Sequence, residues 1–179
     1  MTKNTPYSIF IASSTRRSLR RPAEDRVFVG ELGHAGQREH LGGQGALAVR
    51  EGVAGLGDRR DADLAAVFCS DLARSFRTAE IAFRDRVLPI VRDARLRECD
   101  YGAFTRRSAL EIEQQRVLHV ATPFPNGESS EQVVARVSAW LTEATTTFAG
   151  RTVLVIGHRA TFYALEHLVR DIPLREAVT

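Results

Sequence analysis

TVLVIGHR, residues 152–159, carries the clearest signal of the fold in this chain. Its first five residues form an apolar, largely β-branched run that is typical of a strand buried on both faces of a sheet. Gly157 ends the run, and His158 and Arg159 stand where a helix begins. Open α/β folds bind ligands in the crevice beyond the carboxyl ends of their parallel strands. We therefore expect the imidazole of His158 to face a ligand site and not the core.

Other apolar runs predict further strands, and stretches of helical periodicity separate them. The predicted strands cover residues 7–12, 64–69, 87–91 and 152–156. The predicted helices cover residues 36–53, 71–83, 108–119 and 161–169, with one more that carries the apolar stripe Val133, Val137, Trp140 and Leu141. Strands that alternate with helices favour a parallel sheet with helices on both faces. We expect one domain over residues 1–179.

Helix caps and loops follow from local chemistry. The carboxylate of Asp71 can accept from free backbone amides, so we expect it to cap the helix over residues 71–83. The turn-rich residues 122–127 precede the striped helix, whose expected cap is Ser129 or Ser130. Residues 22–33 are predicted to be loop.

Composition limits the classes of partner. The chain has 179 residues, a formal net charge of +3 and two cysteines. It has no basic block interleaved with aromatic residues, no apolar run near the ~18–20 residues that span a bilayer, and no metal-ligand spacing among its histidines. We expect a cytoplasmic protein with no disulfide, no metal and no cofactor. A small anionic substrate or ligand is the expected partner, with neither nucleic acid nor membrane, and a homodimer is left open.

Polar residues that follow the apolar runs suit an anionic ligand. Arg74 lies one turn into a predicted helix, where guanidinium and helix dipole would act together on an oxyanion, unless it pairs with Asp71. Ser70 can add a hydroxyl to the anion or cap that helix. Glu98 stands near apolar Leu96, and partial burial would raise its pKa and keep a proton available for a leaving group. A solvated loop carboxylate is the alternative for Glu98, and a hydrogen bond at a helix start is the alternative for His158.

Five motifs, in order along most of the chain, resemble those of the histidine phosphatase superfamily, also called phosphoglycerate mutase-like. They are residues 31–37 (ELGHAGQ), 69–80 (CSDLARSFRTAE), 96–102 (LRECDYG), 127–129 (GES) and 155–160 (VIGHRA). Each motif is weak alone, and their shared order makes the resemblance specific. The resemblance implies a three-layer α/β/α sandwich around a mostly parallel sheet.

The resemblance also implies a chemistry. In the family, a histidine in an Arg-His-Gly stretch attacks phosphorus, a second histidine and arginines hold the transferred group, and a carboxylic acid protonates the leaving oxygen. On this chain the second histidine would be His158, an arginine Arg74 and the acid Glu98.

The chain departs from the family at the first of these motifs. Residues 13–15 read Ser-Ser-Thr where the family has Arg-His-Gly, and no histidine precedes His34. The nucleophile position is therefore Ser13 or Ser14. By the same resemblance, Arg16 or Arg17 contacts phosphate, although a run of arginines is also typical of a solvated face.

Three functional hypotheses remain open from the sequence. The first is a phosphatase or mutase-like protein for a small phosphorylated or acidic metabolite, with the phosphohistidine nucleophile missing. The second is an acid–base enzyme, such as an isomerase, cyclase or dehydratase, that uses His158 and Glu98. The third is a pseudophosphatase that binds a phosphorylated ligand without turnover.

Overall fold

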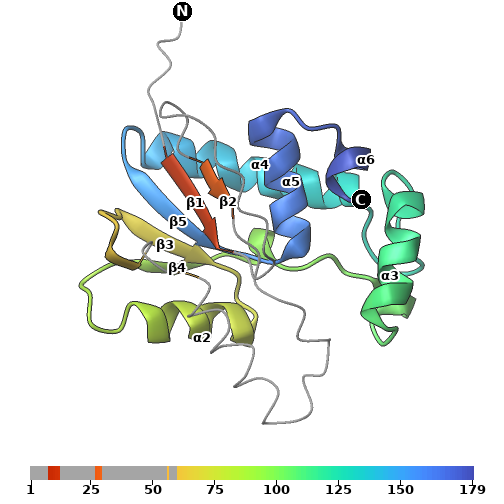
Figure 1. Ribbon diagram of the computed structural model, residues 1–179, viewed down its shortest axis with the longest axis horizontal. Helices are drawn as coiled ribbons and strands as arrows, with labels where there is room; N and C mark the ends of the chain where they lie inside the picture. Colours follow the sequence, from red (N-terminus) through yellow and green to blue (C-terminus); the bar gives the residue numbers. More distant parts are fainter. Residues whose placement is uncertain (1–7, 13–26, 30–55, 57–59) are drawn as a thin grey trace, which may run out of the picture.

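Five parallel strands form one sheet among the residues that the structure describes (Figure 1). The computed structural model describes residues 8–12, 27–29, 56 and 60–179. The strands are β1 (Ser8–Ala12), β2 (Val27–Val29), β3 (Ala66–Cys69), β4 (Ile90–Arg92) and β5 (Thr152–Ile156). Their order is β2-β1-β5-β3-β4, and each neighbouring pair is parallel. β5, which contains the apolar run of residues 152–156, therefore lies in the centre of the sheet.

Helices cover both faces of this sheet, with α2 on one face and α4 and α5 on the other (Figure 1). The described helices are α2 (Ala73–Ala82), α3 (Ala109–Arg116), α4 (Ser130–Thr147), α5 (Arg159–Arg170) and α6 (Leu174–Ala177). Three short 3₁₀ helices, η2 (Ala94–Leu96), η3 (Gly102–Phe104) and η4 (Val117–His119), lie between β4 and α4 in the chain. The three-layer α/β/α prediction is confirmed.

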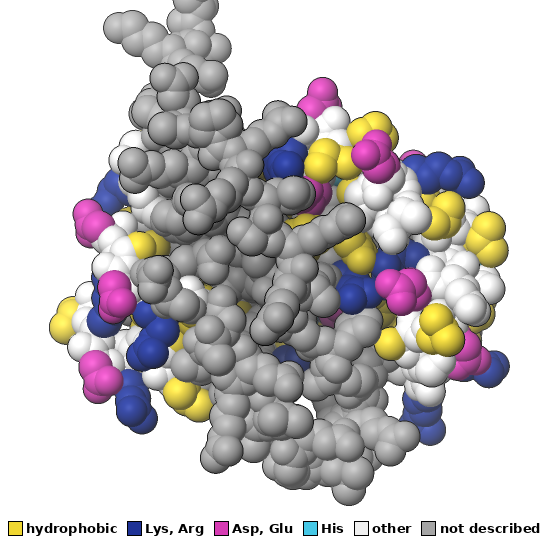
Figure 2. Space-filling view, in the orientation of Figure 1, with side chains coloured by type: hydrophobic (Ala, Val, Ile, Leu, Met, Phe, Trp, Pro, Cys, Tyr) yellow, Lys and Arg dark blue, Asp and Glu magenta, His cyan; other side chains and the backbone are white. Residues whose placement is uncertain are grey.

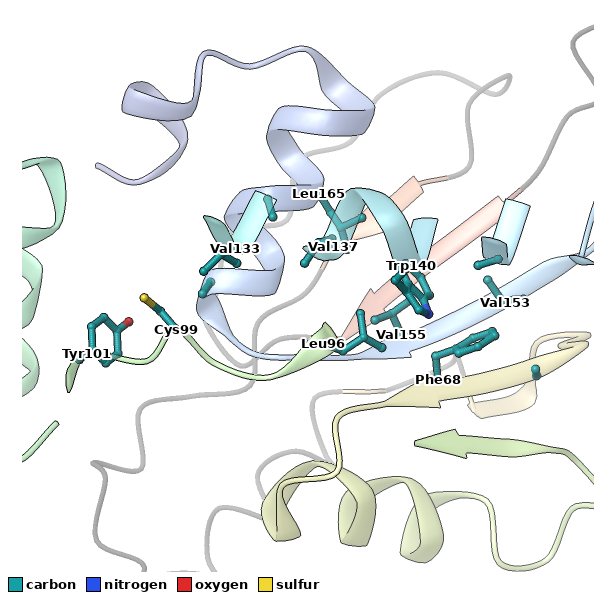
Figure 3. Packing of buried hydrophobic residues seen from close by; sticks show 14 of the residues in the cluster. Phe68, Leu96, Cys99, Tyr101, Val133, Val137, Trp140, Val153, Val155 and Leu165 are labelled. Carbon is teal, nitrogen blue, oxygen red and sulfur yellow. The ribbon is translucent and has the colours of Figure 1, made fainter. Parts of the chain in front are cut away.

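Alternate residues of β3 and β5 pack into two separate cores. Phe68 and Val155 belong to the core under α4 and α5, where Trp140 packs against them (Figure 3). The rings of Phe68 and Trp140 meet edge to face, with their centroids 5.3 Å apart. Val67 and Leu154 belong to the other core, against α2. Burial on both faces explains why the sequence of β5 is apolar throughout and does not alternate.

Two predicted strands begin later than expected, and the last predicted helix begins earlier. β3 starts at Ala66 instead of residue 64, and α5 starts at Arg159 instead of residue 161. β4 covers Ile90–Arg92 instead of residues 87–91. Proline cannot donate to a ladder, and Pro89 instead accepts through its carbonyl oxygen from the amide of Val67, 2.8 Å away. The pairing of β4 with β3 starts there.

One strand lies where the sequence predicts only loop. β2 falls within residues 22–33, and it pairs with β1 in the register Ile9↔Val27. Three residues are too few for a periodic signal. The helix predicted over residues 36–53 lies outside the described residues.

Asp71 does not cap α2, so this prediction is wrong. The N-cap residue is Leu72, and it makes no side-chain capping bond. The carboxylate of Asp71 instead pairs with both arms of Arg97, with 2.6 Å between Nε and Oδ1. A bidentate guanidinium pair is charge-assisted, so it competes well with a bond to a backbone amide.

The cap of α4 is Ser129, one of the two serines that the sequence offers. Its hydroxyl accepts from the amide of Gln132 at 3.2 Å, and the side chain of Gln132 accepts from the amide of Ser129 at 2.8 Å. This reciprocal capping box fixes where the long helix begins. The turn immediately before it, residues 127–129, is one of the motifs of the predicted site.

Acidic and basic side chains are mixed on the face of the described residues that Figure 2 shows. Interspersed charge is typical of a solvated surface. Among the described residues, no helix is both long and apolar enough to cross a membrane.

We predict that Leu154→Ala destabilises the protein strongly. Leu154 is fully buried in the central strand, so truncation leaves a cavity and should lower the free energy of unfolding by about 2–5 kcal/mol. Denaturant unfolding measures this loss. Leu118→Ala is the control, because that side chain is 63% exposed and its loss should change the free energy by less than about 0.5 kcal/mol. Similar losses in the two variants would contradict the central position of β5.

Candidate active site

Three neighbouring strands end at the same level of the sheet. Ile156 of β5 is in register with Ala12 of β1 on one side and with Cys69 of β3 on the other. The segments after these residues therefore leave the sheet at one edge, as ligand-binding segments do in open α/β sheets. Ser70 follows β3 and His158 follows β5 by two residues. Ser13, Ser14, Arg16 and Arg17 come after β1 and lie outside the described residues.

The ring of His158 is buried, and two side chains of the described residues hydrogen-bond to it. Its exposed fraction is 4%, and it occupies the N-cap position of α5. Nε2 lies 2.5 Å from the hydroxyl of Ser70, and Nδ1 lies 3.1 Å from Nη2 of Arg74. A guanidinium can only donate, so Nδ1 accepts and the proton of the neutral ring is on Nε2. Nε2 then donates to Ser70, and the two contacts together fix the tautomer.

Burial keeps this imidazole neutral at physiological pH. Loss of solvent, together with the charges of Arg74 and Arg136, lowers the pKa of His158 well below 6.5, although the charge of Asp71 acts in the opposite direction. A neutral ring beside a guanidinium leaves the cationic charge of this pair on Arg74. Protonation of the ring would place two positive charges at hydrogen-bond distance.

Arg74 is available to an anion. It lies in the first turn of α2 and is half-buried. The alternative partner that the sequence offers, Asp71, is paired with Arg97. Among the described residues, Arg74 makes no ion pair, and the hydrogen bond of its guanidinium goes to the imidazole of His158. A half-buried guanidinium without a carboxylate is suited to take an oxyanion from solution.

Ser70 is fully buried, and its hydroxyl supports the histidine ring. It accepts from His158 and, at 3.4 Å, from the amide of Leu72. Ser75, which the sequence reasoning did not single out, joins the two strand ends. Its hydroxyl donates to the carbonyl oxygen of Ile156 at 2.6 Å and accepts from the amide of Ser70 at 3.2 Å. The carbonyl of a distant strand is its acceptor, and no local pattern in the sequence indicates such a bond.

The carboxylate of Glu98 lies at the start of the helix that follows His158. Glu98 comes after η2 and is half-buried. Its Oε1 accepts from the amide of Ala160 at 3.1 Å, from the amide of Cys99 at 2.9 Å and from the hydroxyl of Tyr101 at 3.4 Å. Ala160 belongs to the first turn of α5, where a negative group is stabilised by the helix dipole. The structure thus brings His158, Arg74 and Glu98 to one edge of the sheet.

The two thiols are poor candidates for nucleophiles. Burial raises the pKa of Cys69 to about 12, and burial with the nearby charge of Glu98 raises the pKa of Cys99 to about 12. The thiolate is the reactive form of cysteine, so both side chains are inert near neutral pH. Among residues 60–179 and the short described segments before them, no group of three His, Cys, Asp or Glu side chains could hold a metal ion.

Comparisons with known proteins agree on one family. The model of the Histidine phosphatase superfamily (branch 1) matches residues 50–178. A curated relative, "Probable phosphoglycerate mutase GpmB" of Klebsiella pneumoniae, is 32% identical over 127 residues, which are 66% of this chain and 59% of the relative. The chain thus spans less than two thirds of that relative's length.

Solved structures give the same fold. YhfR of Bacillus stearothermophilus is 30% identical, with a TM-score of 0.59 over 68% of this chain and 65% of YhfR. The mycobacterial glucosyl-3-phosphoglycerate phosphatase Rv2419c, in complex with inorganic phosphate, is 23% identical, with a TM-score of 0.59 over 75% of this chain and 70% of the other. At that identity the second likeness shows the fold alone.

We predict that His158 makes the folded state sensitive to acid. Below about pH 6.5 the unfolded chain protonates this imidazole and the folded protein does not, so the unfolded state binds more protons. Above that pH the ring is neutral in both states, and this group takes nothing from the free energy of unfolding. Below it, stability should be lost as the pH falls, by up to about 1.4 kcal/mol of unfolding free energy per pH unit. Urea unfolding at a series of pH values measures the slope.

The variant His158→Gln should flatten this acid limb, whatever its effect on the absolute stability. His167→Gln is the control on the same helix, because His167 is only half-buried and bonds the carbonyl oxygen of Ile172. An acid limb that is equally steep in His158→Gln and in the unchanged protein would show that the imidazole is not held neutral.

Proposed function

The chain belongs to the histidine phosphatase superfamily, and on that premise we propose that it binds the phosphate group of a small phosphomonoester between Arg74 and His158. One observation carries the proposal. A guanidinium without a carboxylate partner among the described residues donates to a buried, neutral imidazole, 3.1 Å away. The name of the GpmB relative and the phosphate in the mycobacterial complex support a phosphate ligand.

A bound phosphate dianion would change the charge balance of the pair. Arg74 would turn its donors toward the anion, which frees Nδ1 of His158 to take a proton. A dianion at hydrogen-bond distance favours the charged ring and offsets the loss of solvent that now holds it neutral. The ring would then donate to a phosphoryl oxygen. We therefore expect the ligand and one proton to bind together.

Glu98 is the candidate acid for the leaving group. Its Oε1 is held at the first turn of α5 by the amide of Ala160, and the other carboxyl oxygen is the one proposed to carry a proton to substrate. As the bond between phosphorus and the ester oxygen breaks, that proton would pass to the ester oxygen. General acid catalysis of this kind contributes about 10²–10⁴-fold to rate.

The chain lacks the family's histidine as the group that attacks phosphorus. Ser13 and Ser14 occupy the region after β1 in which the family has its nucleophilic histidine. A serine hydroxyl needs an adjacent base, and Nε2 of His158 already carries its proton toward Ser70. We therefore propose that the protein recognises phosphomonoesters and that turnover is limited by the missing imidazole.

Sulfate binding tests the anion site, because sulfate does not titrate near neutral pH. Calorimetry should find binding that strengthens as the pH falls from about 8 to 6, by up to about tenfold per pH unit, with uptake of one proton. Arg74→Met should abolish it. Arg77→Met, an exposed position on the same helix, should leave it unchanged. Binding that is independent of pH or of Arg74 would overturn the site.

Turnover of an aryl phosphate tests the nucleophile position. We expect Ser13→His or Ser14→His to exceed the unchanged protein in rate, because either change restores an imidazole after β1. A further change of Glu98→Gln should then reduce turnover of an alkyl phosphate by about 10²-fold or more. Sulfate binding without turnover in either variant would favour the pseudophosphatase. The absence of both sulfate binding and turnover would refute the phosphomonoester proposal.

A further inference from the structure

A partly buried ion pair, Arg136 with Glu128, bonds to the backbone on both sides of Glu98, over residues 95–100, which we call the acid segment. We propose that Arg136 is a positioning residue, which holds Glu98 at the site through this ion pair and so sets its competence as the acid. The inference rests on the proposed function and deepens it. Arg136 lies in α4, and the proposed chemistry gives neither it nor Glu128 a contact with the phosphate or a proton to transfer.

Every nitrogen of the Arg136 guanidinium is used, and each bond goes to the acid segment or to Glu128. Nη1 donates to the carbonyl oxygen of Arg95 at 2.5 Å, and Nη2 donates to the carbonyl oxygen of Glu98 at 3.1 Å. Nε and Nη2 donate to the two carboxylate oxygens of Glu128 at 3.0 and 3.1 Å. The side chain is 18% exposed. A planar fork with five donors can bridge these acceptors at once, which a lysine cannot do.

Glu128 extends the same hold to Asp100, two residues after Glu98. Its Oε2 accepts from the amide of Asp100 at 3.0 Å, and its own amide donates to the carbonyl oxygen of Asp100 at 2.7 Å. The two backbones approach so closely that a Cβ on Gly127 would lie 2.2 Å from that carbonyl oxygen. The ion pair therefore binds the backbone three residues before Glu98, at Glu98 and two residues after it.

Both members of the pair are charged at neutral pH. Burial by itself raises the pKa of Glu128, but the bonds from Arg136 and from the amide of Asp100 outweigh it, and the pKa lies below its ordinary value. The charge of Arg136 also reaches His158, where it acts with burial and Arg74 against protonation, and with Asp71 opposed to it. Arg136 thus acts on the charge of His158 and, through a backbone bond, on the position of Glu98.

Positioning explains this arrangement better than helix anchoring does. α4 is already held by its capping box and by the buried side chains of Val133, Val137 and Trp140 (Figure 3). Two nitrogens of Arg136 donate to main-chain carbonyl oxygens of the acid segment, and these bonds restrict movement of the Glu98 backbone. A shift of about 1 Å in a reacting group can cost about 10²-fold in rate, so such restriction has a functional effect.

The amide of Ala160 reports the position of Glu98 without any assay of activity. It donates to Oε1 of Glu98, so its hydrogen exchange becomes faster when the carboxylate moves away. In Arg136→Lys we expect the Ala160 amide to exchange at least about tenfold faster relative to that of Ala164, a buried residue of the same helix. The ratio removes the effect of a change in global stability. Glu128→Gln serves as the second variant, should the first fail to fold.

Glu143→Gln is the matched control. Glu143 also lies on α4 and pairs with a residue of the acid segment, Arg95, at 2.8 Å, but its side chain is 67% exposed. The Ala160 to Ala164 ratio should stay at its original value in this variant. An unchanged ratio in Arg136→Lys and Glu128→Gln would overturn the inference, even if sulfate binding and turnover confirmed the proposed function.

Two substrates with different leaving groups provide a catalytic test. It uses whichever protein hydrolyses phosphomonoesters, the unchanged chain or a variant with histidine at position 13 or 14. Misplacing the acid should lower kcat for an alkyl phosphate by about 10–10²-fold in Arg136→Lys and spare an aryl phosphate whose phenolate leaves without a proton. KM and sulfate affinity should stay unchanged, since Arg74 and His158 remain. Equal losses on both substrates would assign Arg136 a structural role only. If the chain proves to bind no sulfate, the proposed function fails and the exchange ratio alone decides the position of Glu98.

Discussion

The burial of one imidazole beyond the ends of two neighbouring parallel strands is the constraint on which the site depends. Because His158 is almost without solvent, each ring nitrogen needs a partner in the protein. Both partners, Ser70 and Arg74, come from the segment after β3, so the ring is satisfied only when β3 and β5 are neighbours in register. Ser75 joins the same two strand ends. The fold and the protonation state of the histidine are therefore fixed by one set of contacts.

The acid segment meets this histidine through the backbone of α5. Glu98 accepts from the first turn of that helix, and Arg136 holds the carbonyl oxygen of Glu98 from the other side. Elements from three parts of the chain, after β3, after β4 and after β5, thus converge beyond the carboxyl ends of the strands. A parallel sheet brings such segments together because all of its strands end at the same edge.

The sequence predicted much of this and missed particular parts for identifiable reasons. The candidates His158, Arg74 and Glu98 follow from residue type at strand ends and from the resemblance, and all three lie at that edge. The sequence predicts a helix cap at Asp71 because capping is a local rule, whereas the actual partner, Arg97, is distant in sequence. The roles of Ser75, Arg136 and Glu128 depend on backbone carbonyls and amides, which carry no sequence signal. The roles of Ser13, Ser14, Arg16 and Arg17 stay predictions.

The layered α/β architecture follows from the amino-acid sequence, because apolar runs that alternate with helical periodicity can bury their side chains in few other ways. The sequence also determines which chemical groups stand at the strand ends. Three further properties become visible only in the folded protein: which nitrogen of His158 holds the proton, the lack of a carboxylate partner for Arg74 among the described residues, and the side chains that hold Glu98. These properties depend on distances between residues far apart in the chain, and distances arise only when strands and helices pack.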